Sequence, residues 1–236
     1  MNSEHDRLKY RREGAGNFLN RLLKSDSRQL KKMLAGYPKY SLPHPGICRS
    51  LSVKQATENF QFFEQQKKHR LVAISDLLGK FDISIDYAKP DKHSLLLLDA
   101  WAYQQWGAIY DSTIKKNKMY SFIQDEPQVR MRSLLFDTSV LLGECYLSLN
   151  NAARWHLDSS ESSKGAGRTT YNRVVILLPP EENQSSDRSK LLDMEENVFY
   201  HYAAQKSSNG VIDAEQKIGR VLAEPVIKLI EEQNKT

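Results

Sequence analysis

The pattern of apolar side chains predicts a long buried helix near the middle of the chain. Between residues 132 and 155, apolar side chains occupy most positions around a helical circumference, and a helix that is apolar on nearly all sides is normally buried. The helix can begin as early as Val129, and the Asn pair at 150–151 is suited to end it. Inside it lie Gly143 and Glu144, neither of which a simple core helix favours.

Apolar residues at helical spacing predict further helices on both sides of this one. Ser52 followed by Gln55 is typical of a capping box, and Gly79 suits the end of the helix that Ser52 opens. The charged segment 64–70 is expected to leave that helix exposed to solvent. Pro225 must kink or restart the last helix. The predicted helices cover about residues 17–34, 52–79, 94–110, 129–151, 191–202 and 212–232.

Three segments with strand character predict a small sheet. Apolar and polar residues alternate through residues 81–87, which is typical of a half-buried strand. Residues 153–158 and 170–178 are predicted to form a hairpin, with the Ser- and Gly-rich segment between them as a mobile tip. The predicted fold class is therefore α+β, predominantly helical, with a small antiparallel or mixed sheet.

The predicted domain organisation is one core with helical extensions at both ends. Residues 1–50 are interpreted as a basic helical arm followed by a Pro-rich connector, and residues 51–180 as the α+β core. Residues 181–236 are interpreted as a C-terminal helical extension that packs on the core as one domain. A chain of 236 residues with 40% hydrophobic residues can bury a core of this size.

Composition favours a cytoplasmic location. No apolar run approaches the roughly 18 residues that a membrane-spanning helix needs, and the first residues hold no apolar leader segment. Cys48 and Cys145 are too few and too far apart to suggest a disulfide framework, so a reducing compartment is expected.

Positive charge is concentrated near the N-terminus. Residues 1–40 hold ten Lys or Arg and four Asp or Glu, whereas the whole chain has a formal net charge of +5. A basic helix of this kind can contact nucleic acid, although a charge run is more often a solvated helix face. This alternative function would use Arg21, Lys24, Arg28, Lys31 and Lys32.

Glu144 is the first candidate for chemistry. A carboxylate within an apolar helix needs a partner or a raised pKa, and perturbed acids cluster at functional sites. A structural ion pair explains such a residue equally well, with Arg130, Arg132 or Arg154 as the possible cations. The enzymatic alternative is a nuclease-like carboxylate cluster that combines Glu144 with Asp82, Asp86 or Asp99.

The sequence contains no recognisable motif for binding a metal or a cofactor. The six histidines have no paired ligand spacing, and neither cysteine lies in a C-x-x-C motif, so we predict no metal and no cofactor. The segment from Lys164 to Arg168 has glycines and basic ends but lacks the order of a phosphate-binding loop. It is interpreted as a flexible tip, whose glycines and basic ends would also suit a contact loop. Trp101 and Trp106 lie five residues apart, so one is expected in the core and the other as an exposed anchor for a partner.

Three segments resemble a pattern found in uncharacterised bacterial α+β domains. That pattern has a strand-to-helix segment reading L-D-Y-S-P-E-S-L…L-D, then a helix reading G-x-Y-L-G-E, then a strand that carries a Trp. The resemblance covers about residues 80–178 and departs from the pattern at Ala88-Lys89, where a Ser cap is expected. It implies a fold and no enzymatic activity. The residues that carry it are Ile85-Asp86-Tyr87, Pro90, Ser94-Leu95, Leu98-Asp99, Leu142-Gly143-Glu144 and Trp155.

Together these observations favour a non-enzymatic cytoplasmic protein that binds another protein. Its most concrete form is a bacterial immunity-type protein that neutralises a toxin; a subunit of another complex is also possible. The sequence leaves the oligomeric state open. The candidate partner-binding residues are Glu144, Trp101, Trp106, Lys164 and Arg168.

Overall fold

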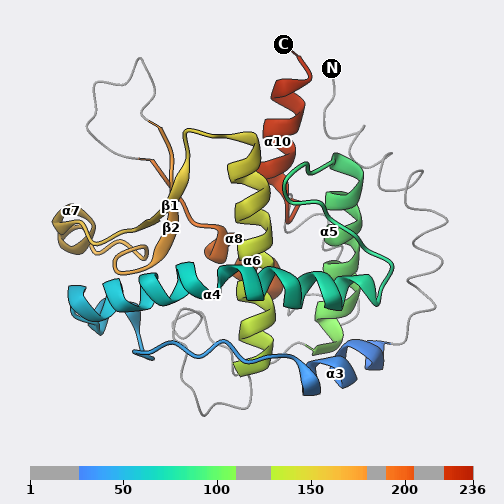
Figure 1. Ribbon diagram of the computed structural model, residues 1–236, viewed down its shortest axis with the longest axis horizontal. Helices are drawn as coiled ribbons and strands as arrows, with labels where there is room; N and C mark the ends of the chain where they lie inside the picture. The colour runs from blue at the N-terminus through green and yellow to red at the C-terminus, as the bar shows by residue number, and fades with distance from the viewer. Residues whose placement is uncertain (1–26, 110–128, 180–189, 205–220, 236) are drawn as a thin grey trace.

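The computed structural model describes residues 27–109, 129–179, 190–204 and 221–235, and its elements surround the central helix α6 (Val129–Leu149). Figure 1 shows α4 (Val53–Gly79) crossing α6, and α5 (Lys92–Trp106) roughly parallel to α6. Further contacts to α6 come from α3, α8 and α10. The remaining helical elements are α3 (Ser27–Gly36), η1 (Cys48–Ser50), η2 (Gly107–Ile109), α7 (Glu161–Gly165), α8 (Met194–Ala204) and α10 (Glu224–Gln233).

The prediction of a buried central helix is confirmed. Every residue of α6 from Met131 to Gly143 is buried, and the backbone N–H of Asn150 closes the last turn on the carbonyls of Tyr146 and Leu147. One cluster of buried apolar side chains extends from Leu30 in α3 through α4, α5, α6 and α8 to α10. Among the described residues, no helix combines the length and the apolar character needed to cross a bilayer.

Helix α4 begins and ends as predicted. The Ser52 hydroxyl accepts from the Gln55 N–H at 3.3 Å, and the Gln55 amide oxygen accepts from the Ser52 N–H at 3.0 Å, which completes the capping box. The expectation that segment 64–70 is exposed is wrong at Arg70, whose side chain is buried against α6. In the C-terminal region, Pro225 lies in the first turn of α10. Backbone N–H groups in this turn have no acceptor within the helix, so the missing N–H of proline costs no hydrogen bond.

The sheet has three antiparallel strands, which agrees with the predicted α+β fold class. One predicted strand, at residues 81–87, is wrong. β1 (Arg154–Leu157) pairs with β2 (Val174–Leu177), placing Trp155 opposite Ile176, and β2 pairs in turn with β3 (Leu191–Leu192). Residues 81–87 form no strand.

A helix-end motif explains why residues 81–87 resemble a strand. The N–H of Asp82 donates to Gly79 O, and the N–H of Ile83 donates to Leu78 O. Asp82 itself has a φ of 58°, so this is a Schellman closure with an Asp in the left-handed position. Phe81 and Ile83 reach the core on either side of it, which produces the alternating burial without any strand partner.

Candidate functional site

Glu144 is held by two partners from other elements. The indole N–H of Trp155 on β1 donates to Glu144 Oε1 at 2.7 Å, and Lys67 Nζ on α4 lies 3.3 Å from the same oxygen. The Glu144 side chain is 20% exposed. A structural ion pair therefore accounts for this acid, but its cation is Lys67, not one of the three arginines that the sequence suggested.

Gly143 provides the space for the same tryptophan. A Cβ atom built on Gly143 would lie 2.2 Å from Cζ2 and 2.3 Å from Cη2 of Trp155, so the indole ring rests directly on the helix backbone. Phe63 of α4 contacts the other side of the indole, edge to face, with the ring centroids 5.1 Å apart. The group that lies against Gly143 is therefore a side chain from β1. Gly143, Glu144 and Trp155 together fasten the sheet to the helical core.

The expectation of an exposed tryptophan on α5 is wrong. Trp101 and Trp106 are both fully buried, and their rings contact each other edge to face with the centroids 6.2 Å apart. Trp101 contacts Phe81 at 5.6 Å between ring centroids, and Trp106 contacts Tyr202 of α8 at 6.3 Å. Because both indoles are fully buried, neither can serve as a surface anchor.

The carboxylates of the enzymatic alternative have separate structural tasks. Asp99 is buried and accepts from the backbone N–H of Leu222 at 2.8 Å, whereas Asp86 is exposed and accepts from the N–H of Ala88 at 3.0 Å. Asp82 occupies the exposed end of α4. In the described parts of the chain, no group of three or more His, Cys, Asp or Glu side chains is arranged to hold a metal ion.

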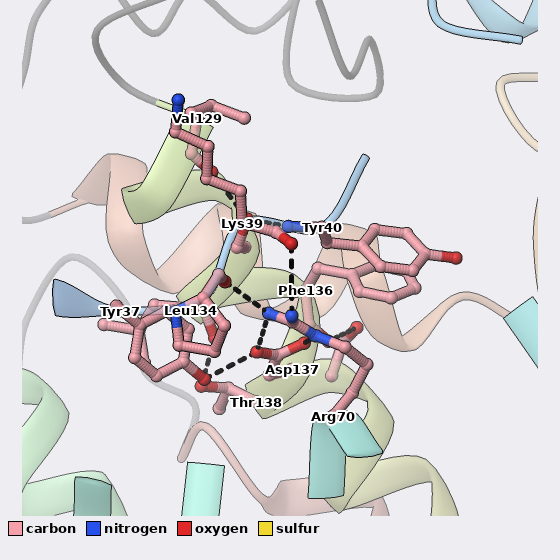
Figure 2. A network of polar contacts seen from close by, with 12 residues as sticks. Tyr37, Lys39, Tyr40, Arg70, Val129, Leu134, Phe136, Asp137 and Thr138 are labelled. Carbon is pink, nitrogen blue, oxygen red and sulfur yellow. Dashed lines mark hydrogen bonds and ion pairs between the residues drawn. The ribbon is translucent and has the colours of Figure 1, made fainter. Parts of the chain in front are cut away.

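The strongest polar network was not predicted, and it surrounds Asp137 (Figure 2). Arg70 Nε of α4 donates to Asp137 Oδ1 at 2.7 Å, and its Nη2 donates to Oδ2 at 2.5 Å. The Tyr37 hydroxyl donates to Oδ2 at 2.5 Å. Asp137 has no exposed surface and Arg70 has almost none. Three elements thus meet at one buried carboxylate.

Burial dominates the electrostatics of this network. It raises the pKa of the Asp137 carboxyl to about 6, while the hydrogen bonds and charge of Arg70 and the hydroxyl of Tyr37 act in the opposite direction. Burial alone would lower the pKa of Arg70, but its bonds to Asp137 raise that pKa above the ordinary value. Burial also raises the pKa of the Tyr37 hydroxyl, which therefore remains a donor.

The network fixes the connector between α3 and η1. Arg70 Nη2 also donates to the carbonyl of Pro38 at 2.9 Å, and the N–H of Tyr40 donates to Ser133 Oγ at 2.8 Å. The Tyr40 ring stacks on Phe136 with the centroids 4.4 Å apart. These contacts hold the connector against α4 and α6, so the backbone leading to η1 has a defined course. Figure 2 shows Tyr40 beside Phe136, and Arg70 beside Asp137.

A polar framework gives the loop between β1 and β2 a fixed shape. The Asp158 carboxylate accepts from Ser160 Oγ at 3.0 Å and from Thr170 Oγ1 at 2.5 Å. The Asp158 carbonyl accepts from the N–H of Asn172 at 2.6 Å, and Asn172 has a φ of 60°. Buried Arg173, next in the chain, is bound through two hydrogen bonds to Asp193 before α8. The segment predicted as an irregular tip thus contains the short helix α7.

The segment around η1 braces the same loop from outside. Arg49 Nη2 donates to the carbonyl of Gly167 and, at 3.0 Å, to that of Arg168. The side-chain amide of Asn172 donates to the carbonyl of Leu51 at 2.9 Å. As Figure 1 shows, α7 consequently lies beside the N-terminal end of α4. The sequence indicates Lys164 and Arg168 but not Arg49, whose contacts to the carbonyls of Gly167 and Arg168 span 118 and 119 residues of the chain.

These two segments form an exposed surface, which we call the loop face. Ile47 is 53% exposed and Val53 is 45% exposed, although both are large apolar residues. The Lys164 side chain is 57% exposed, and the carboxylate nearest to it is Glu161 at 3.5 Å. We define the loop face by Ile47, Arg49, Val53, Lys54, Glu161, Lys164 and Arg168.

The nucleic-acid alternative is described only in part. Lys31 and Lys32 lie exposed on α3. Arg21 and Lys24 lie outside the described residues, as does the side chain of Arg28. The described part of α3 shows two of the five basic side chains, so this alternative stays a prediction.

Comparison of the chain with protein-family models, with curated proteins and with solved structures finds no match in any of the three. The resemblance to uncharacterised bacterial domains stays a prediction. Within its pattern, Gly143, Glu144 and Trp155 do meet in space. The helix start differs, because Asp91 is the N-cap of α5 and accepts from the Ser94 N–H at 2.9 Å.

Proposed function

We propose that this protein binds another protein through the loop face. The observation that carries the proposal is a loop whose backbone is braced from within by Asp158 and from outside by Arg49, while Glu161, Ser162 and Lys164 of α7 remain exposed. A loop ordered before binding loses little conformational entropy when a partner binds, and this favours recognition. Neutralisation of a bacterial toxin is the narrower form of the proposal.

Two exposed apolar residues on one small surface support the same proposal. Ile47 and Val53 flank η1 and the N-cap of α4, next to the point where Arg49 contacts the loop. Single exposed apolar residues are common, but these two lie six residues apart with the exposed Arg49 and Lys54 close by in the chain. An apolar core with a polar rim is the usual composition of an interface.

Site-specific photo-crosslinking in the native host tests this function. A crosslinking amino acid at Ile47 is expected to capture one protein in near-stoichiometric yield, because this position lies in the proposed interface. Val72 is the matched control, since it is 54% exposed against 53% for Ile47. Val72 lies about 30 Å along α4 from its N-terminal end. Equal capture from both positions, or none from Ile47, would contradict the proposal; a captured toxin would support its narrower form.

A further inference from the structure

The loop face carries an excess of positive charge around its apolar pair. Arg49, Lys54, Lys164 and Arg168 are cationic, and Glu161 is the one carboxylate within the defined face. The ion pair between Glu161 and Lys164 at 3.5 Å is largely exposed to solvent, so it neutralises little of this charge. Glu58, one turn further along α4, is paired with His44 of the connector.

The cations have two kinds of role. The Arg49 guanidinium donates to the backbone carbonyls of Gly167 and Arg168 and so stabilises the loop. Lys54 and Lys164 are exposed, and among the described contacts neither bonds to the loop backbone. Their ammonium groups are therefore available to an incoming partner, and replacing them leaves the loop framework intact.

We infer that the partner presents an acidic surface with apolar side chains at its centre. This inference rests on the proposed function and specifies the chemistry of the partner. Ile47 and Val53 supply apolar contact area, and the surrounding lysines select carboxylates and repel basic surfaces. Such charge complementarity accelerates association and makes it sensitive to salt.

Binding of defined probes to the purified full-length chain tests the inference. Fluorescence anisotropy is measured with a short peptide of leucine and glutamate, with the same peptide carrying lysine for glutamate, and with single-stranded oligouridine. The glutamate peptide is expected to bind about tenfold more tightly than the lysine peptide, and less tightly when NaCl rises from about 50 to about 500 mM. Tighter binding of the RNA, equal binding of both peptides, or no binding of the glutamate peptide overturns the inference.

Charge reversal locates the effect on the loop face. Lys54→Glu combined with Lys164→Glu is expected to weaken binding of the glutamate peptide about tenfold. Lys80→Glu is the matched control, because Lys80 is exposed and lies beyond the far end of α4, about 40 Å away. An equal effect of the control, or no effect of the double variant, overturns the inference. Crosslinking from Ile47 distinguishes the proposed function from the inference about the partner. If the double variant still captures the same partner, protein binding through the loop face is supported and the acidic partner surface is contradicted.

Discussion

Replacement of Asp137 by alanine is expected to lower the free energy of unfolding by about 3 to 5 kcal/mol, measured by chemical denaturation. The variant leaves the Arg70 guanidinium without its counter-ion in a place from which water is excluded. The Tyr37 hydroxyl loses its acceptor. Arg70 is no longer held in place by Asp137, so its bond to the Pro38 carbonyl is weakened as well. Removing one member of a buried charge pair costs more than the pair itself contributes, because the remaining charge stays desolvated.

Two further variants separate this cause from a general effect of removing an acid. Asp76 is exposed on α4, so Asp76→Ala should change the free energy of unfolding by no more than about 0.5 kcal/mol. Combining Asp137→Leu with Arg70→Met removes both buried charges and should recover most of the loss, since an apolar pair of similar volume avoids the desolvation cost. A double variant as unstable as Asp137→Ala would show that the ion pair is not the source of the effect.

The helices could largely be predicted from the sequence because their signals are local. The buried stripe of α6 and the capping box of α4 each depend on residues within a few turns of one another. Residues 81–87 show the limit of such signals. Alternating burial is produced equally by a strand and by two side chains on either side of a Schellman closure, and only the backbone partners distinguish them.

The sites were harder to predict because their partners are distant in sequence. Glu144 was selected as an acid within an apolar helix, yet the same argument applies more strongly to Asp137, which lies seven residues earlier and is fully buried. Its cation is 67 residues away, and no spacing rule connects the two. The loop face is hard to predict for the same reason. Its basic loop can be recognised in the sequence, but the contact between that loop and Arg49 depends on the tertiary fold.

Burial also distinguishes a structural role from a catalytic role for Asp137. Asp137 has a raised pKa, as many catalytic acids have, but it is surrounded by three hydrogen bonds that satisfy it and has no exposed surface. Its contacts instead order the connector that leads to η1 and Arg49. We therefore assign the buried network to stability and, through the connector, to the shape of the loop face.

Gly143→Ala should lower the free energy of unfolding by about 1 to 3 kcal/mol, although alanine is the better helix former by about 1 kcal/mol. The new methyl group would lie 2.2 Å from an atom of the Trp155 ring, and the ring cannot move freely. Phe63 contacts the indole edge to face, and Glu144 accepts its N–H at 2.7 Å. The overlap must therefore displace β1 from α6 or break the bond to Glu144.

The sign of this substitution is expected to reverse when the indole is removed. In a Trp155→Ala background the space above Gly143 is open, so the same Gly143→Ala change should raise the free energy of unfolding by about 1 kcal/mol. Gly79→Ala is the control in the native background, because a Cβ there meets nothing within 4 Å. It should be neutral or slightly stabilising. A stabilising Gly143→Ala in the native background would mean that the indole does not rest on the helix, and the attachment of the sheet to α6 would need another explanation.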